Sequence, residues 1–368
     1  MMFDEQKVMT WDPDEPIPVL NQVTIPAETF RDGIIVRGSN WLGDAVMTFP
    51  ALKQLRSILP PYCGLCVVTP AGLAPVYHAL KGVVDRVIPL SNAHAFPTKD
   101  EKYELHTFHA GAGVIFNNSF RDALIFKLAG VKRLYGAKAR NRSILLAASW
   151  KFEKRRDHEL NHPHQALKYL AMAQALGAAP WDGEMPEMTP GACSDEITAL
   201  MKNPDVLAIA PGAAYGDGKR WRAAHFRAVA EKWLEKYPDG RVLALGSRAE
   251  FDGAGEAIEG LDPARAINLA GKTSLDELMY ILKYARFCIA NDSGIMHLSA
   301  ALGSSGIAVF GSTDPAATAP VSQKWYMLYD KLPCSPCFKR VCPLGTKACL
   351  DRITPADVIA LMEKLSVI

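Results

Sequence analysis

The chain has 368 residues, of which 49 % are hydrophobic and 22 % are charged, and its formal net charge at pH 7 is +2. This composition is typical of a globular protein and excludes an intrinsically disordered chain. Because the charge is nearly balanced, it also excludes a generic binder of nucleic acid. At roughly 100 to 200 residues per domain, the length predicts two domains.

No segment predicts a membrane span or a secretory signal. No apolar run approaches the ~20 residues that a transmembrane helix requires. Residues 1–18 are acidic and contain prolines, without the basic start of a signal peptide. We therefore expect a cytoplasmic protein, in which the eight cysteines are reduced thiols.

Residues 1–30 contain four prolines and no sustained periodicity, so we interpret them as an irregular N-terminal arm. The apolar run 33–37 then predicts a buried strand, and a glycine-containing turn at 38–44 leads into a helical pattern. Further strands are predicted at 65–69, 86–89 and 113–116, and helices at 73–80, 120–128 and 165–176. The alternation predicts a parallel sheet covered on both faces, in a first domain at 31–185.

The same pattern starts again after a stretch rich in Pro, Gly and Met at 177–190, which we interpret as a linker. Strands are predicted at 206–210, 242–245, 287–290 and 307–310, and helices at 224–236, 275–284 and 295–302. We place a second domain at 204–350 and a C-terminal helix at 351–368. The predicted fold class is α/β, with two Rossmann-like, doubly wound domains facing a cleft, where ligands bind at the carboxyl ends of the strands.

The first polar motif is RGSNWLGD at 37–44, between the first strand and the first helix. Its glycines permit a tight turn, and Asp44 then lies in the first helical turn. A carboxylate there can accept a proton from a sugar hydroxyl in an inverting displacement; alternatively, Asp44 only stabilises the helix N-terminus. The spacing is neither GxGxxG nor Walker A, which disfavours a nicotinamide dehydrogenase.

The second motif is APGAAYGDGKRW at 210–221, between a strand and a helix. Its small residues let backbone N–H groups approach a phosphate, and Lys219 can neutralise a departing diphosphate. The alternative is a solvated basic loop. We expect Trp221 to pack in the core.

The third motif is ANDSGIMH at 290–297, which follows a strand and opens a helix. Asp292 and Ser293 are candidate caps, and the N–H groups of a helix N-terminus can bind an anion. His297 lies one turn beyond Ser293 on the same face. The alternative is an ordinary cap followed by a packed or solvent-facing histidine.

The motifs resemble those of bacterial ADP-heptose:lipopolysaccharide heptosyltransferases, most closely the type II enzymes that add the second heptose of the inner core. The resemblance covers about residues 31–366 and implies a metal-independent GT-B enzyme whose donor substrate is ADP-heptose. It implies a lipid A–core glycolipid acceptor and so a peripheral position at the inner membrane. Five segments occur in the same order as in that family: RGSNWLGDAVMTFPALKQLR, APGAAYGDGKRW, GKTSLDEL, ANDSGIMHLSAAL and VFGSTDP.

The resemblance also implies roles for single residues. Asp44 matches the general base, and Lys219 matches the lysine that binds the donor phosphate. The implied donor site comprises Gly212, Lys219, Glu250, Thr273, Asp292, Ser293, Gly294 and His297. The implied acceptor site comprises Asn40, Trp41, Asn118 and Arg121, the last two in or beside a segment, 116–120, that resembles the family's Asn-Ser-Phe sequence.

Two other functions stay open on the residues alone: a GT-B transferase for another nucleotide sugar, and a non-catalytic protein that binds a nucleotide sugar or glycan. The oligomeric state is also open. A basic stretch in the first domain predicts either binding of acceptor phosphates or anionic lipid, or a solvated face. It comprises Lys132, Arg133, Lys138, Arg140, Arg142, Lys151, Lys154, Arg155 and Arg156.

Four of the cysteines follow the spacing C-x2-C-x4-C-x6-C. This spacing is compatible with a compact four-thiolate metal site, with disulfides or with free thiols. A similar cysteine-rich tail occurs in part of the heptosyltransferase family, and we do not place it among the catalytic residues. The four are Cys334, Cys337, Cys342 and Cys349.

Overall fold

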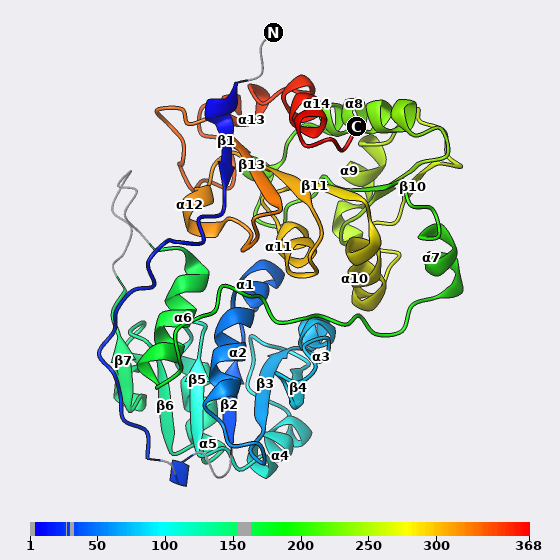
Figure 1. Ribbon diagram of the computed structural model, residues 1–368. Helices are drawn as coiled ribbons and strands as arrows, with labels where there is room; N and C mark the ends of the chain where they lie inside the picture. The colour runs from blue at the N-terminus through cyan, green and yellow to red at the C-terminus, as the bar shows by residue number, and fades with distance from the viewer. Residues whose placement is uncertain (1–3, 27, 30–32, 153–162) are drawn as a thin grey trace. The chain divides into compact units, whose positions relative to one another are not determined.

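The computed structural model describes residues 4–26, 28–29, 33–152 and 163–368, and the chain folds into two compact units (Figure 1). The N-terminal unit comprises Asp14–Pro190. The C-terminal unit comprises Gly191–Ile368 together with Met1–Pro13. Both ends of the chain therefore belong to the same unit.

Six parallel strands form the sheet of the N-terminal unit, in the order β4-β3-β2-β5-β6-β7. The strands are β2 (Ile34–Arg37), β3 (Leu65–Pro70), β4 (Arg86–Leu90), β5 (Ala112–Ile115), β6 (Arg133–Ala137) and β7 (Ala148–Trp150). The central strands β2 and β5 are buried at every residue, as expected for a parallel sheet covered on both faces. The chain moves outward from β2 to β4 and then returns to the other side of β2, so the topological switch point lies between β2 and β5.

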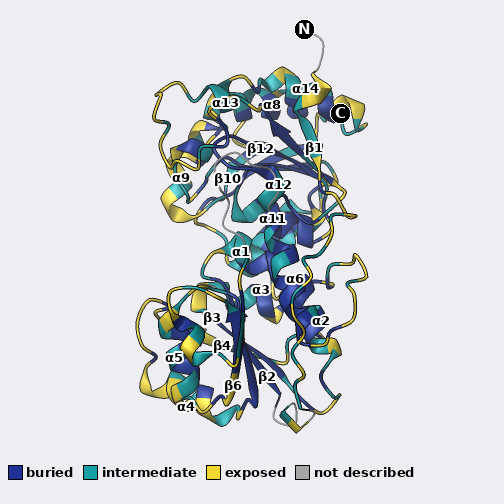
Figure 2. Ribbon diagram, turned by 90° about the vertical axis from the view of Figure 1, so that its left-hand side faces the viewer, coloured by how far each residue is buried: buried dark blue, intermediate teal, exposed yellow. Residues whose placement is uncertain are grey.

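Helices cover both faces of this sheet. α2 (Phe49–Ser57) packs against α6 (Gln165–Ala175) on one face, and α4 (Lys99–Thr107) and α5 (Phe120–Leu128) lie on the other (Figures 1 and 2). The shorter elements are α1 (Leu42–Met47), α3 (Ala74–His78) and 3-10 turns at Ala71–Leu73 and Arg142–Leu145.

The C-terminal unit has a seven-stranded sheet in the order β1-β13-β12-β11-β8-β9-β10, in which only β1 runs antiparallel to its neighbour. The strands are β1 (Val8–Thr10), β8 (Val206–Ala210), β9 (Arg241–Ala244), β10 (Ala266–Asn268), β11 (Phe287–Asn291), β12 (Gly306–Phe310) and β13 (Trp325–Tyr329). Its six parallel strands repeat the order of the N-terminal unit. The switch point here lies between β8 and β11.

The helices of this unit also lie on two faces, α8 and α14 on one and α10 and α11 on the other (Figures 1 and 2). α8 is amphipathic and buries Phe226, Val229 and Trp233 at helical spacing. The helices are α7 (Asp195–Leu200), α8 (Ala223–Lys236), α9 (Phe251–Glu256), α10 (Leu275–Tyr284), α11 (Gly294–Ala301), α12 (Pro315–Thr318), α13 (Ala348–Asp351) and α14 (Pro355–Lys364), with 3-10 turns at Glu5–Lys7, Asp217–Lys219 and Arg248–Glu250.

The division of the chain differs from the sequence prediction at the N-terminal arm and at the linker. The arm predicted at 1–30 is not irregular throughout, because β1 pairs with β13 and Trp11 is buried. The predicted linker at 177–190 belongs to the N-terminal unit, and the predicted boundary at residue 31 lies outside the described residues. The C-terminal helix predicted at 351–368 is present as α14 (Pro355–Lys364), which packs against α8 within the C-terminal unit.

Candidate active site

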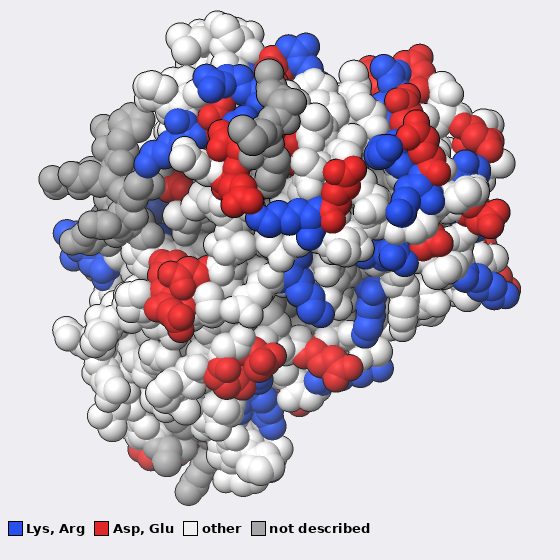
Figure 3. Space-filling model, turned by 45° about the horizontal axis from the view of Figure 1, so that its top comes forward, with Lys and Arg blue, Asp and Glu red and all other residues white. Residues whose placement is uncertain are grey.

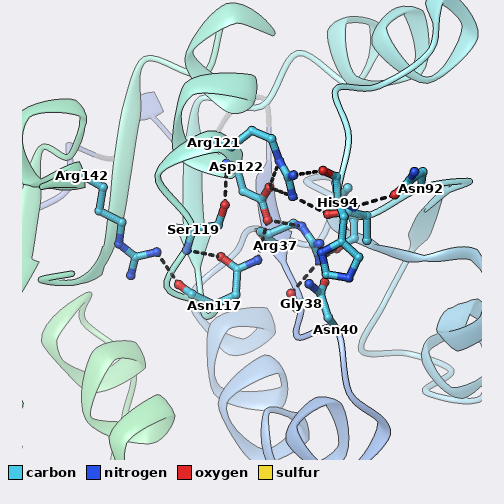
Figure 4. Close-up of polar contacts among 12 residues, drawn as sticks. Arg37, Gly38, Asn40, Asn92, His94, Asn117, Ser119, Arg121, Asp122 and Arg142 are labelled. Carbon is cyan, nitrogen blue, oxygen red and sulfur yellow. Dashed lines mark hydrogen bonds and ion pairs between the residues drawn. The ribbon is translucent and has the colours of Figure 1, made fainter. Parts of the chain in front are cut away.

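The switch point of the N-terminal unit contains a buried arginine at the end of β2 (Figure 4). Arg37 is 1 % exposed, and its Nε lies 2.9 Å from Oδ2 of Asp122. Its Nη1 donates to the carbonyl oxygen of Gly38 (2.7 Å) and its Nη2 to Oδ1 of Asn40 (2.6 Å). Burial lowers the pKa of Arg37, and the charge of Asp122 opposes this. The guanidinium thus joins the end of β2 to the turn that leads to Asp44.

Asp122 reaches the same point from the first turn of α5. Ser119 caps this helix by accepting a hydrogen bond from the backbone N–H of Asp122 (3.1 Å), and Asn117 Nδ2 donates to Oδ2 of Asp122 (2.5 Å). Since both side chains of the Arg37–Asp122 pair are at most 3 % exposed, each depends on the other for charge compensation. Sequence reasoning missed this pair; the Ser119-x-x-Asp122 capping pattern was the available signal.

The predicted acceptor residues lie on these two loops but differ in exposure. Asn40 is bound to Arg37. Trp41 is 61 % exposed, although large apolar side chains favour burial, and Asn118 is also exposed. Trp41 and Asn118 are therefore accessible to a ligand, whereas Asn40 contributes to the scaffold.

Asp44 lies half-buried in the first turn of α1. Burial raises the pKa of Tyr77 to about 12 and also raises the pKa of Tyr169, and the charge of Asp44 adds to both shifts. The carboxylate therefore lies within electrostatic range of two buried phenols. Asp44 therefore lies at the switch point of the N-terminal unit, in the helix that follows β2.

Two further arginines at this edge bind main-chain carbonyl groups (Figure 4). Arg121 donates to the carbonyl oxygens of residues 93 and 94 and contacts Asp122. Arg142 is fully buried and donates to the carbonyl oxygens of Ala137 (2.7 Å) and Asn117. Burial lowers the pKa of Arg142 to about 10. Both guanidinium groups thus hold loops of the scaffold.

The predicted basic stretch is not one surface. Lys132 and Arg133 lie at the amino end of β6, whereas Lys138 and Arg140 follow its carboxyl end, roughly 17 Å away for a five-residue strand. Arg142 is buried, and Lys154, Arg155 and Arg156 lie outside the described residues. Acidic and basic side chains are also interspersed on the face drawn in Figure 3.

In the C-terminal unit the second and third motifs meet at the switch point. Nζ of Lys219, in the turn after β8, lies 2.5 Å from Oδ2 of Asp292, directly after β11. The side chain of Asp292 is 3 % exposed and that of Lys219 is 14 % exposed. The hydroxyl of Thr313 also donates to Oδ2 of Asp292. Because an ammonium group has three donors, Lys219 can hold Asp292 and a ligand phosphate together.

Asn291 fixes the positions of both loops. Its Nδ2 donates to the carbonyl oxygen of Pro211 (2.7 Å), and its Oδ1 accepts from the backbone N–H of Trp221 (3.0 Å). Trp221 is 2 % exposed and its Nε1 donates to the carbonyl oxygen of Ile353 (2.7 Å). Trp221 therefore packs in the core, as the sequence predicts, whereas the role of Asn291 was missed.

The N-terminus of α11 lies beside the Lys219–Asp292 pair. Ser293 is the N-cap residue, but its side chain makes no capping hydrogen bond, and within the described residues its Oγ has no partner. Gly294 is the first residue of the helix. Burial and the charge of Lys219 lower the pKa of His297 to about 3, so its imidazole is neutral near pH 7.

Gly212 and Glu250 are also brought together. A Cβ atom at Gly212 would lie 2.2 Å from Oε1 of Glu250, so a side chain at position 212 would displace the Glu250 carboxylate. Oε2 of Glu250 accepts hydrogen bonds from the N–H and hydroxyl of Ser247 (both 2.8 Å). Thr273 precedes Ser274, the N-cap of α10, and among the described residues it has no hydrogen bond with the other predicted donor residues.

Comparison with known proteins identifies the family of this chain. The model of glycosyltransferase family 9 (heptosyltransferase) matches residues 105–348, which is more than half of the chain. The chain belongs to this family. It is thus a glycosyltransferase, and its donor-side motifs lie within the matched region. Among the described residues no helix is long and apolar enough to cross a membrane.

Relatives of the same kind match over most of their length. A lipooligosaccharide heptosyltransferase 2 of Haemophilus influenzae is 27 % identical over 79 % of this chain and 86 % of its own. A lipooligosaccharide heptosyltransferase 2 of Campylobacter jejuni is 31 % identical over 90 % of this chain and 98 % of its own. The solved structure of Escherichia coli ADP-heptose LPS heptosyltransferase II covers 90 % of this chain and 98 % of that one, with a TM-score of 0.72 and 24 % identity. The fold is therefore GT-B.

Proposed function

We propose that this chain transfers a heptose from ADP-heptose to the lipopolysaccharide inner core, as a type II heptosyltransferase. The names of its relatives support the donor and the acceptor. The structural observation that carries the proposal is the Lys219–Asp292 pair beside the N-terminus of α11. A cation and unpaired helix N–H groups at a switch point are suited to a nucleoside diphosphate.

The donor diphosphate binds to Lys219 and to the backbone N–H groups of the first turn of α11. These groups stabilise the negative charge that develops on ADP as the glycosidic bond breaks. Ser293 supplies the hydroxyl that has no partner within the described residues. Since fixed donors perform this role, the transfer needs no metal ion. Gly212, Glu250 and Thr273 complete the donor site on the nucleoside side.

Asp44 is the general base. It removes the proton from the acceptor hydroxyl as that oxygen attacks the anomeric carbon, ADP leaves, and the configuration at this carbon inverts. The transition state has oxocarbenium character. Trp41 and Asn118, which are exposed on the adjacent loops, contact the acceptor. The acceptor is a glycolipid, so the enzyme works at the surface of the inner membrane.

The test is a panel of donors and acceptors analysed by mass spectrometry. With ADP-heptose and a core acceptor that carries one heptose, we expect a product that is one heptose heavier, together with ADP. UDP-glucose and ADP-glucose serve as controls that should yield no product. Transfer from another nucleotide sugar alone, or ADP-heptose binding without transfer to any acceptor, would contradict the proposal.

A further inference from the structure

The cysteine-rich segment from the end of β13 into α13 gathers four thiols around one pocket. Cys334, Cys337, Cys342 and Cys349 all line a cavity of about 30 Å³. None of them forms a disulfide. The C-x2-C-x4-C-x6-C spacing thus corresponds to a real cluster in space. Four thiols around one small cavity are the ligand set of a tetrahedral metal ion.

The segment itself has little regular structure to hold it. Residues 330–347 form turns and contain no helix or strand. Connections of this length without secondary structure are uncommon in compact domains, so this one depends on contacts or cross-links that hold it in place. Ser335 anchors one point, because its hydroxyl donates to the carbonyl oxygen of Gly311 (2.6 Å). Leu350 packs close to Gly311 at the far end. A cross-link among the four cysteines would fix the residues between these two anchors.

The segment also holds the loop that carries Lys219. The backbone N–H of Gly218 donates to the carbonyl oxygen of Arg340 (2.8 Å), and Nζ of Lys347 lies 3.1 Å from Oδ1 of Asp217. A Cβ atom at Gly218 would lie 2.5 Å from the carbonyl oxygen of Lys339. Gly218 therefore contacts the segment directly and also lines the cysteine pocket.

The geometry points to a structural metal site in which these four cysteines bind one zinc or iron ion as thiolates and thereby fix the loop that precedes Lys219. Among the described residues no three side chains are already spaced for a metal ion. Metal binding therefore has to bring the four sulfurs closer together, to about 2.3 Å from a shared ion.

All four thiols line the same pocket, so as thiolates they repel one another, and a bound divalent cation removes this repulsion.

Metal analysis of the full chain, purified without chelator, tests the inference. We expect about one zinc or iron per chain in the unchanged protein, and at least a tenfold loss of metal in Cys337→Ser and Cys342→Ser. The matched control is Cys193→Ser, a half-buried cysteine outside the pocket, which should keep its metal. Elemental analysis distinguishes zinc from iron.

Cobalt replacement keeps the test decisive if the serine variants fold poorly. Co²⁺ added to the unchanged, metal-depleted chain should give the absorption of thiolate-to-cobalt charge transfer with four sulfur ligands. A chain that contains no metal and gives no such absorption overturns the inference, and so does a disulfide found among the four cysteines in fresh protein. These readouts do not depend on ADP-heptose being the donor, so the site can be tested even if the proposed function fails.

Discussion

The two switch points of the molecule use the same strand order but place their ion pairs differently. In the N-terminal unit the cation is Arg37, on β2 itself, and its pair with Asp122 is buried on both sides. In the C-terminal unit the cation is Lys219, on a loop beyond β8. Its side chain is more exposed than that of its partner, Asp292. The first pair therefore holds a scaffold together, whereas we propose that the second presents a charge to a ligand. The variants below test this distinction.

Asp44→Asn should have the largest effect. Losing the general base lowers kcat by about 10²- to 10⁴-fold, while the Kd for ADP stays unchanged because Asp44 belongs to the N-terminal unit. Steady-state kinetics and ADP titration measure the two quantities. Asp100→Asn is the matched control, since Asp100 is exposed in the first turn of α4. Normal turnover by Asp44→Asn would remove this residue from catalysis.

Asp122→Asn tests the scaffold pair. It leaves the Arg37 charge buried without compensation, and the free energy of unfolding should fall by about 3–5 kcal/mol. Denaturant unfolding measures this change. Glu104→Gln disrupts the half-exposed Arg86–Glu104 pair and should change stability by less than about 1 kcal/mol. Equal losses in the free energy of unfolding in Asp122→Asn and Glu104→Gln would contradict a scaffold role for the Arg37–Asp122 pair.

Lys219→Ala tests the ligand-facing pair. The kcat/KM should fall by about 10²- to 10³-fold, which corresponds to about 3–4 kcal/mol of transition-state stabilisation, and the Kd for ADP should rise. The control is Lys232→Ala, at a half-exposed lysine on α8. Unchanged ADP binding and turnover in Lys219→Ala would show that Lys219 only compensates the charge of Asp292.

We expect the titration of His297 to make the stability of the folded chain depend on pH. Its pKa is lowered to about 3 in the folded chain, against about 6.5 in an unfolded one, so between these values the unfolded chain binds the extra proton. Stability should therefore decrease on acidification, by about 2 kcal/mol from pH 7 to pH 5. His297→Gln should lack this part of the pH dependence, whereas His78→Gln, at an exposed site, should retain it. If the free energy of unfolding changes equally with pH in both variants, the pKa of His297 is not lowered in the folded chain.

Local signals account for what could be predicted from the sequence. The helices at 120–128 and 275–284 match α5 and α10 to the residue, because Ser119 and Ser274 mark their starts. The proximity of Lys219 to Asp292 was also predictable, since both follow parallel strands. Strands β1, β6, β7, β10 and β13 were not predicted.

Nonlocal partners account for what was missed. β1 is only three residues long, and its partner is the distant strand β13, so no local pattern marks it. Arg37 was within a recognised motif, but its pairing with Asp122 depends on how β2 and β5 become neighbours. The same holds for Asn291, whose hydrogen bonds reach two other loops.

The pairing of β1 with β13 constrains the order of events at the ribosome. Val8 is synthesised about 320 residues before its partner Leu328. During that interval the whole N-terminal unit emerges and can fold, as domains generally do during synthesis. β1 must then remain unpaired until β13, whose edge it covers, has been synthesised. Vectorial synthesis therefore makes closure of this sheet edge one of the last steps in maturation.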